Sequence, residues 1–480
     1  MISPETRAKY RATIGIECHV QLKTKTKLFS GAGNDAREAP PNTLVNHIDF
    51  GLPGALPVLN KEAAHLASRA AFALGSTPQR FSKFDRKHYF YPDLPMGYQI
   101  TQYDEPIILG GSVAIEVDGQ KKTIGITRAH LEADAGKSTH PAGEDYSLVD
   151  LNRAGTPLLE IVSEPDMHSA ADAKAYAHEL YLRMRYADVS DANLYYGNMR
   201  FDVNVSVSQT DELGTRSETK NLNSFRAVEK AVEYEIDRQI ELLEKGGTVA
   251  QETRGWDDAK QKTFSQRSKE NADDYRYMPD PDLPPIELDD AYIEKIKSEM
   301  PELPDDYRTK FQQINIDKQV IEDIIADPGT AVFVSRIFDK AGAEPARRIA
   351  FWLLGLNRDE AEETELDLDS HGDQLIKLAQ MTGDKKLSST AAKEVFAEIM
   401  AAGGDPEQIA ADKGLLQVSD EGEIAKIVEQ VLNDNQKAAE DVKNGEMKAI
   451  GFLVGQVMKA SKGKANPQLA QDLIKKQLGI

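Results

Sequence analysis

A strict alternation of side-chain types from Thr13 to Leu22 constrains the fold more than any other feature of the sequence. Aliphatic residues and the single cysteine, Cys18, occupy every second position, and polar residues or glycine stand between them. Successive side chains of a β-strand point to opposite faces, so this period of two predicts a strand with one buried face. Cys18 lies on that face, where a thiol packs as a small hydrophobe and is not a nucleophile.

The opposite face of this strand presents Glu17 and His19 together. The pair can bind one metal ion, or it can lie on a solvent-facing strand without a role. Two further alternating segments favour the first interpretation. One presents Arg128, His130, Glu132 and Asp134 opposite Gly125, Thr127, Ala129, Leu131 and Ala133. The other presents Arg200, Asp202, Asn204 and Ser206 opposite Phe201, Val203, Val205 and Val207.

Carboxylates beside an imidazole suit Mg²⁺ or Mn²⁺, and arginine nearby suits phosphate. If the three predicted strands face a common cavity, these residues describe a site for a metal ion and a nucleotide phosphate. One apparent motif is excluded. "DAGKST" (Asp134–Thr139) resembles the end of a phosphate-binding loop, but that motif requires glycine where this chain has Leu131. ATP, if used, is therefore not held by a Walker motif.

The bulk composition limits the class of protein. The chain has 480 residues and a net charge of −21, which indicates several domains and argues against a general nucleic-acid coat. No apolar run approaches the ~20 residues of a membrane span, and the N-terminus lacks the apolar core of a signal peptide. One cysteine excludes an intrachain disulfide and indicates a reducing compartment, so we expect a cytoplasmic protein.

The distribution of patterns along the chain predicts an α+β fold. We expect a large N-terminal domain, residues 1–295, with a mixed, mostly antiparallel sheet and flanking helices. An all-α region, residues 296–404, and a small helical tail, residues 405–480, should follow. Two helices of the first domain are well marked, one from Ser169 to Ala187 and one between Ser224 and Gly246.

Two aromatic and proline-rich segments echo one another, "HYFYPDLPMGY" (His88–Tyr98) and "YRYMPDPDLPP" (Tyr275–Pro285). Such segments fix extended or turn backbone. We interpret them as two similar loops that build a wall, and not as a true internal duplication.

Eight blocks, in order along the chain, resemble one known family. They are Gly51–Asn60, Phe84–Ile107, Arg128–Lys137, Asp150–Met167, Gly197–Ser206, Thr219–Phe225, Asp274–Pro285 and Gly451–Pro467. The sequence is similar to the B subunits of the glutamyl/aspartyl-tRNA amidotransferases, which work with the A and C subunits of the same enzyme.

The resemblance implies a two-step reaction. ATP, with Mg²⁺, phosphorylates the side-chain carboxylate of Glu on tRNA(Gln) or Asp on tRNA(Asn), and ammonia then displaces the phosphate to form the amide. The glutaminase partner, which is the A subunit, releases that ammonia from glutamine, and an internal channel delivers it. No glutaminase nucleophile is visible in this chain, which agrees with imported ammonia. Which mischarged tRNA is used stays open.

The family's site residues can be carried over by position. The resemblance implies metal ligation by Glu17, His19, Glu132 and Asp202. It places Arg200, Asn204, Lys220, Arg153 and Lys87 in the same catalytic pocket. Tyr89 and Tyr91 are candidates for the wall of the channel or of the acceptor-end site, and aromatic packing beside Pro92 and Pro95 is the alternative.

The C-terminal region resembles the family's tRNA-binding domain. It carries seven lysines from Lys443 onward against two acidic residues, a balance suited to an RNA backbone or, alternatively, to a solubilising face. The tRNA-binding candidates are Lys448, Lys459, Lys462 and Lys464.

One departure from the family concerns zinc. Many relatives carry a four-cysteine knuckle, but the matching positions here read "SGAG" (Ser30–Gly33) and "NHID" (Asn46–Asp49). We therefore expect no structural zinc, and we expect ordinary packing to hold this loop.

Two other functions compete with amidation. An RNA-binding scaffold has no need for three polar strand faces. A stand-alone metal-dependent ligase agrees poorly with the lysine-rich tail and the missing ammonia source. The sequence therefore favours a component of the three-part amidotransferase, with no membrane partner.

Overall fold

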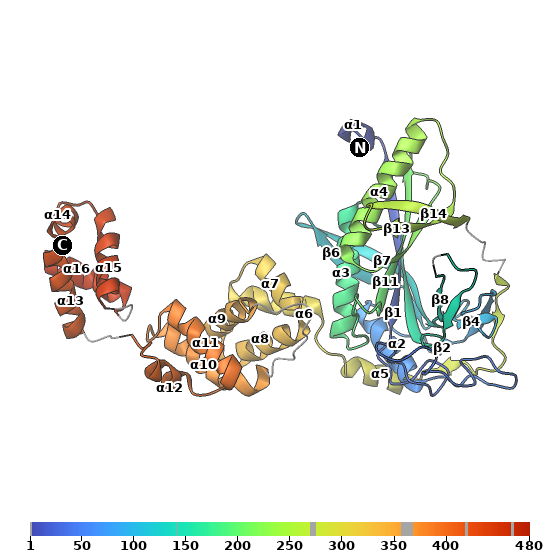
Figure 1. Cartoon of the computed structure of the whole chain (residues 1–480), viewed down its shortest axis with the longest axis horizontal. Helices are drawn as coiled ribbons and strands as arrows, with labels where there is room; N and C mark the ends of the chain where they lie inside the picture. The colour runs from blue at the N-terminus through green and yellow to red at the C-terminus, as the bar shows by residue number, and fades with distance from the viewer. Residues whose placement is uncertain (1, 142, 269–274, 357–367, 418–420, 462–464) are drawn as a thin grey trace. The chain divides into compact units, whose positions relative to one another are not determined.

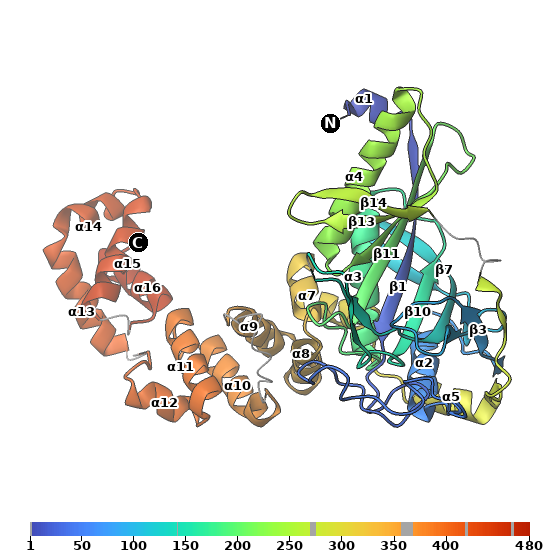
Figure 2. The ribbon, with the colours of Figure 1, turned by 45° about the vertical axis from the view of Figure 1, so that its right-hand side comes forward.

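The computed structural model describes residues 2–141, 143–268, 275–356, 368–417, 421–461 and 465–480. The chain divides into two compact units, Met1–Pro304 and Asp305–Ile480. Figures 1 and 2 give two views of the first unit, which is built on a sheet, and of the second, which consists of helices. The predicted fold class, a mostly antiparallel sheet with flanking helices followed by helices alone, is confirmed.

The first unit contains the strands. They are β1 (Arg11–Gln21), β2 (Phe81–Ser82), β3 (Asp85–His88), β4 (Tyr98–Thr101), β5 (Ile108–Leu109), β6 (Ser112–Val117), β7 (Gln120–Ala133), β8 (Lys137–Thr139), β9 (Leu148–Asp150), β10 (Pro157–Ser163), β11 (Met199–Ser208), β12 (Ser217–Leu222), β13 (Glu252–Asp257), β14 (Lys262–Ser268), β15 (Met278–Pro279) and β16 (Ile286–Glu287). Its helices are α1 (Pro4–Arg7), α2 (Lys61–Ala73), α3 (Ala170–Tyr186), α4 (Phe225–Glu244) and α5 (Asp290–Ser298).

The main sheet has the order β14-β13-β12-β11-β1-β10-β7-β5, and β6 pairs with β7 beside this path. Neighbouring strands are antiparallel except β12 and β13, which are parallel. β1 lies in the middle of the sheet and buries Ile14, Ile16, Cys18 and Val20 on one face. The alternation predicted for this strand is therefore confirmed.

Helices α3 and α4 cover one face of the sheet, as Figure 1 shows. Both begin where a serine caps the free backbone N–H groups of the first turn. Ser169 accepts a hydrogen bond from the backbone of Asp172, and Ser224 accepts one from Ala227. The aliphatic face of β1 and β11 packs against these helices in one core, so the polar face points the other way.

Strand β7 departs from the predicted alternation. Its register on β10 shifts once beside Thr127, which is the mark of a β-bulge. Thr127 is exposed whereas Ile126 is buried, so the prediction that Gly125 and Thr127 share the apolar face is wrong. Because of the extra residue, the side chains that point into the core change from even-numbered to odd-numbered positions beyond Thr127. Beyond the bulge, Leu131 is buried as predicted.

A small sheet, β15-β3-β4, brings the two echoing segments together. Met278 pairs with Arg86, and Pro279 pairs with Asp85. The second segment therefore contributes the edge strand β15, which lies beside β3, and β3 ends at His88, where the first segment begins. The interpretation of the two segments as similar wall-building loops stays a prediction, and the pairing shows that they lie side by side.

The second unit is helical. Its elements are α6 (Pro304–Phe311), the 3-10 helix η2 (Gln312–Ile314), α7 (Lys318–Ile325), α8 (Pro328–Ala341), α9 (Ala343–Leu354), α10 (Leu368–Gly383), α11 (Ser389–Ala402), α12 (Pro406–Asp412), α13 (Glu421–Asp434), α14 (Gln436–Lys443), α15 (Lys448–Ala460) and α16 (Pro467–Leu478).

Helices α13 to α16 share an apolar core that includes Val428, Leu453 and Ile474. Helix α12, which begins just after the predicted boundary at residue 404, packs against α10 and α11. The boundaries expected near residues 295 and 404 stay predictions. Among the described residues, no helix combines the length and apolar character needed to cross a bilayer.

Candidate active site on the open face of the sheet

The polar residues predicted on separate strands lie on one sheet face. In the registers of β11, β1 and β10, Glu17 pairs with Asp202, and His19 lies between Arg200 and Glu160. β10 separates β1 from β7, so the third predicted strand is one position further away. The predicted strands therefore share one polar face, to which β10 contributes. The common cavity that the sequence interpretation assumed stays a prediction.

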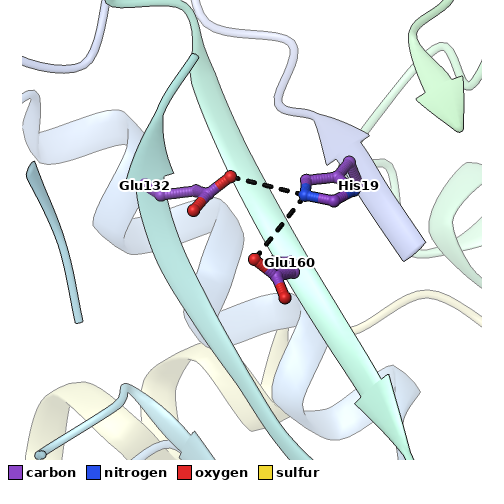
Figure 3. A group of neighbouring side chains, drawn as sticks. All are labelled: His19, Glu132 and Glu160. Atoms are coloured by element: carbon purple, nitrogen blue, oxygen red, sulfur yellow. Dashed lines mark ion pairs between the residues drawn. The ribbon is translucent and has the colours of Figure 1, made fainter. Parts of the chain in front are cut away.

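One cluster on this face, which we call the imidazole cluster, consists of His19, Glu132 and Glu160 (Figure 3). His19 Nε2 lies 3.5 Å from a Glu132 oxygen and 3.6 Å from a Glu160 oxygen. His130 approaches from β7, with Nε2 3.3 Å from Glu160. These side chains come from β1, β7 and β10, and their carboxylates converge on the imidazole nitrogen.

Charge coupling within the imidazole cluster is strong. Burial alone would lower the pKa of His19, but its ion pair with Glu160 and the surrounding carboxylates raise that pKa to about 9. Burial and the charge of Glu160 raise the pKa of Glu132. Burial opposes ionisation of Glu160 too, yet His130 and His19 bring its pKa well below the usual value. A cation between the two carboxylates offsets their repulsion, and the His19 proton is one such positive charge.

A second cluster, which we call the oxygen cluster, consists of Glu17, Asp202 and Glu218. Lys220 Nζ lies 3.0 Å from Asp202 and 3.2 Å from Glu218. Asn204 donates its amide N–H to Glu17 at 3.0 Å. Burial and the neighbouring charges of Glu160 and Glu218 raise the pKa of Glu17. Burial would lower the pKa of Lys220, but Asp202 and Glu218 raise it.

Both clusters fit a divalent cation. In each, one candidate ligand atom from every residue lies within 4.8 Å of the others. The Asn204 side-chain oxygen is buried beside the oxygen cluster and has no hydrogen-bond partner among the residues that the structure describes. A buried amide oxygen without a partner is costly, and it is a ligand that Mg²⁺ accepts. The all-oxygen set suits Mg²⁺, and the set with an imidazole suits Mg²⁺ or Mn²⁺.

The structure divides the predicted metal ligands between the two clusters. Glu17 and Asp202 lie in the oxygen cluster, and His19 and Glu132 lie in the imidazole cluster. Sequence reasoning missed the third member of each. Glu160 is the one charged residue within the aliphatic run "LLEIV" of β10, a signal that was available. Glu218 alternates with Lys220 on β12, a short pattern that gives a weaker signal.

Two arginines converge on Asp134 at the end of β7. Arg200 pairs with Asp134 at 3.0 Å, and Arg153 pairs with the same oxygen at 3.2 Å. Arg153 also donates to the backbone carbonyls of Ala135 and Gly136. The charge of Asp134 raises the pKa of Arg200, which therefore remains a cation. Both predicted arginines thus lie beside the imidazole cluster.

Lys87 and Tyr89 lie close together at the end of β3. Lys87 Nζ is 5.9 Å from the centre of the Tyr89 ring, and the Tyr89 and Tyr91 rings are 5.9 Å apart. Burial alone would lower the pKa of Lys87, but Tyr277, Glu132 and Glu160 raise it. Tyr89 is largely enclosed whereas Tyr91 is half exposed, so a role in the wall fits Tyr89 better.

The loop between Lys27 and Asp49, for which no structural zinc is expected, contains a buried ion pair. Lys27 is fully buried, with Nζ 3.6 Å from Asp49 and 3.3 Å from the Leu151 carbonyl. Ser30 donates to Asp49 at 2.9 Å. These contacts fasten the loop to the segment that carries Arg153. Apolar patterning cannot reveal such a buried pair.

The predicted tRNA-binding lysines belong to the helical tail. Lys448 and Lys459 are exposed at the two ends of α15. Lys462 and Lys464 lie outside the described residues.

Comparison with known proteins identifies the class. Residues 12–294, which carry both clusters, match the protein family described as "GatB/GatE catalytic domain", and residues 336–478 match the family described as "GatB domain". The class is therefore that of the GatB/GatE catalytic domains.

Full-length relatives narrow this class. The aspartyl/glutamyl-tRNA(Asn/Gln) amidotransferase B subunits of Alkalilimnicola ehrlichii and of Caldanaerobacter subterraneus are each 47% identical, and each match covers 98% of this chain and 99% of the relative. The corresponding protein of Ralstonia pickettii is 46% identical over the same shares. The chain belongs to the family of aspartyl/glutamyl-tRNA(Asn/Gln) amidotransferase B subunits, as its sequence blocks indicated.

Proposed function

We propose that the chain forms part of a glutamine-dependent tRNA amidotransferase, in which it acts with the A and C subunits in the cytoplasm. In this proposal it phosphorylates the side-chain carboxylate of Glu-tRNA(Gln) or Asp-tRNA(Asn) with ATP and then forms the amide. The observation that carries the proposal is the pair of carboxylate clusters on one sheet face, both fitted to divalent cations. A carboxylate is a poor electrophile, and conversion to an acyl phosphate gives it a leaving group.

The two clusters would divide the handling of charge. Glu17, Asp202 and Glu218 would hold one Mg²⁺ with the Asn204 oxygen, and His19, Glu132 and Glu160 would hold a second cation. Bound Mg²⁺ supplies positive charge that neutralises phosphate oxygens during phosphoryl transfer. His19 must release its proton for its nitrogen to act as a ligand, so proton loss and cation binding are linked at this residue.

The cations that surround the clusters would bind the transferred phosphoryl group and the acyl carboxylate. Arg200 and Arg153 are held in place by Asp134, and Lys220 by Asp202. Donors fixed before the reaction stabilise developing charge without reorganisation. Lys87, on β3, would also bind the transferred phosphoryl group.

The amide nitrogen would come from outside this chain. Cys18 is fully buried, and burial raises the pKa of its thiol well above the usual value. It therefore cannot serve as a glutaminase nucleophile, which agrees with ammonia delivered from the glutaminase partner. Tyr89 is a candidate for the wall along which ammonia or the acceptor end arrives.

The helical tail would bind tRNA through Lys448, Lys459, Lys462 and Lys464. Replacing Lys448 and Lys459 with alanine should raise the KM for tRNA and flatten its dependence on salt, because each phosphate contact contributes to that dependence. An unchanged KM and salt dependence would reject the assignment of these two lysines.

The decisive experiment is reconstitution of the chain with its A and C subunits, followed by an assay on both mischarged tRNAs. Formation of Gln-tRNA(Gln) or Asn-tRNA(Asn) that requires ATP and glutamine supports the proposal and also identifies the substrate. The proposal is rejected if the assembled complex consumes no ATP with either mischarged tRNA.

A further inference from the structure

Lys87 differs from the other cations of the site in the groups that surround it. Arg200 and Lys220 each pair with a carboxylate at 3.0 Å. Within the described ranges, no carboxylate oxygen comes within ion-pair distance of Lys87 Nζ. Its neighbours are aromatic faces instead, with the ring centre of Tyr275 at 4.8 Å and that of Tyr89 at 5.9 Å.

The Tyr275 ring belongs to a continuous aromatic stack. It meets the Tyr277 ring edge to face at 6.1 Å, and Tyr277 lies parallel to Tyr103 at 4.0 Å and 11°. The Arg128 guanidinium lies 5.7 Å from the centre of the Tyr103 ring and donates to the Tyr103 carbonyl. The stack thus reaches from β7 to the lysine, and each ring is supported by the next.

The backbone fixes the same arrangement independently. β15 follows Tyr277 directly and pairs with β3, the strand that carries Lys87. Tyr275 also contacts Tyr89 at 6.2 Å, so the ring is held on a second side. Rings restrained in this way form a rigid support for an ammonium group.

The kind of support matters for chemistry. A carboxylate partner occupies the N–H donors of a lysine, and a phosphate must then displace it. An aromatic face attracts the ammonium through its quadrupole and leaves N–H donors available, and the attraction grows when water is excluded. A lysine held by rings therefore meets an incoming anion without first breaking an ion pair.

We propose that Tyr275, supported by Tyr277, is a positioning residue that holds the Lys87 ammonium ready for the phosphoryl group transferred at the carboxylate clusters. This assignment rests on the proposed function. It differs from plain packing, because an aliphatic side chain of similar size can cover Lys87 but cannot attract its charge.

The test compares Tyr275→Leu with Tyr275→Phe in the assembled three-subunit enzyme. Phenylalanine keeps the ring face and loses only the hydroxyl, whereas leucine removes the ring. We expect Tyr275→Leu to lower kcat about five- to thirtyfold, the effect of losing a desolvated cation–π contact, with the KM for tRNA unchanged. Tyr275→Phe should retain wild-type kcat. Equal losses in both variants, or none in either, would overturn the proposal.

A second readout needs no reaction. Acylation of Lys87 by an amine-reactive ester, followed by peptide mass spectrometry on enzyme without ATP or tRNA, reports how firmly the ammonium is held. The exposed Lys174 gives an internal reference. Tyr275→Leu should accelerate labelling of Lys87 about five- to thirtyfold relative to Lys174, and Tyr275→Phe should not. Equal labelling in wild type and Tyr275→Leu would contradict the proposal.

Failure of this inference can be separated from failure of the proposed function. If wild-type enzyme carries out no ATP-dependent amidation of tRNA, the proposed function fails whatever the variants do. If Tyr275→Leu prevents assembly, Tyr275→Met keeps a long flexible side chain at the same place and is tested in both assays instead. Wild-type kcat and labelling in that variant would then overturn the proposal.

Discussion

The imidazole cluster and the oxygen cluster lie side by side on one sheet face, yet different cations compensate their charge. In the oxygen cluster Lys220 bridges two carboxylates as a permanent charge. In the imidazole cluster the compensating charge is a proton on His19, which can leave. If both candidate sets of three ligands bind cations, we therefore expect binding at the imidazole cluster to depend on pH near neutrality and binding at the oxygen cluster to depend on pH much less.

The largest expected effect comes from removing one charge in each cluster. Glu132→Gln and Glu17→Gln keep the side-chain shape and should each lower the rate of aminoacyl-tRNA phosphorylation by about a thousandfold, since a bound cation contributes several kcal/mol to such a step. Single-turnover phosphorylation with ³²P-labelled ATP measures this.

The matched control is Glu212→Gln, which alters an exposed carboxylate beyond β11 and should leave the rate unchanged. Assembly of the three-subunit complex should survive in all three variants. If Glu17→Gln is fully active and Glu132→Gln is inactive, the two clusters are not equivalent. Only the imidazole cluster would then take part in catalysis.

The pH dependence of cation binding should separate the clusters next. The pKa of His19 is raised to about 9, so the proton competes with a metal ion at neutral pH. Affinity of the imidazole cluster for Mn²⁺ should rise about tenfold per pH unit from 7 towards 9, because one proton leaves for each ion bound. Calorimetric titration of Glu17→Gln, in which the oxygen cluster is weakened, checks this. A flat profile would mean that His19 is not a ligand.

The same shift has a consequence for stability without metal. A histidine whose pKa is higher in the folded chain stabilises the fold fully below its unfolded pKa, about 6.5, and loses this contribution as pH rises through about 9. The metal-free protein should therefore become less stable across that window unless a divalent cation replaces the proton. Urea unfolding with and without Mn²⁺ measures the difference, and His19→Gln should abolish it.

A smaller effect tests the oxygen cluster alone. Asn204→Leu removes the unpartnered amide oxygen and the hydrogen bond to Glu17, and it should raise the Kd for Mg²⁺ about tenfold. kcat at saturating Mg²⁺ should remain within a few-fold of wild type. Binding measured by calorimetry at pH 7 decides this, and an unchanged Kd would remove Asn204 from the ligand set.

The smallest effect is expected at Cys18, which lies between Glu17 and His19 on β1 but faces the core. Cys18→Val should leave both clusters and the activity unchanged, at a cost in unfolding free energy of about 1 kcal/mol. Denaturant unfolding and the amidation assay measure the two quantities. A stable but inactive variant would mean that the assignment of the two faces of β1 is wrong.

Much of the first unit could be predicted from local patterns. Period-two alternation identified the inner strands and their faces, and Ser169 and Ser224 marked the starts of two helices. The prediction went wrong at Thr127, where a bulge moves the buried positions from Ile124 and Ile126 to Ala129 and Leu131. Glu160 was missed because alternation emphasises polar faces, and its strand is apolar on both sides.

The sequence blocks that resemble a known family were enough to indicate the family, and local patterns were enough to predict the fold class and the side of β1 on which chemistry is possible. Three features emerged only when the chain was seen folded. The candidate ligands form two clusters, Glu160 and Glu218 complete them, and tyrosines far along the chain lie against Lys87. Strand order and register set these contacts, and they result from pairing between segments separated by tens to hundreds of residues. Local patterns carry no record of that pairing.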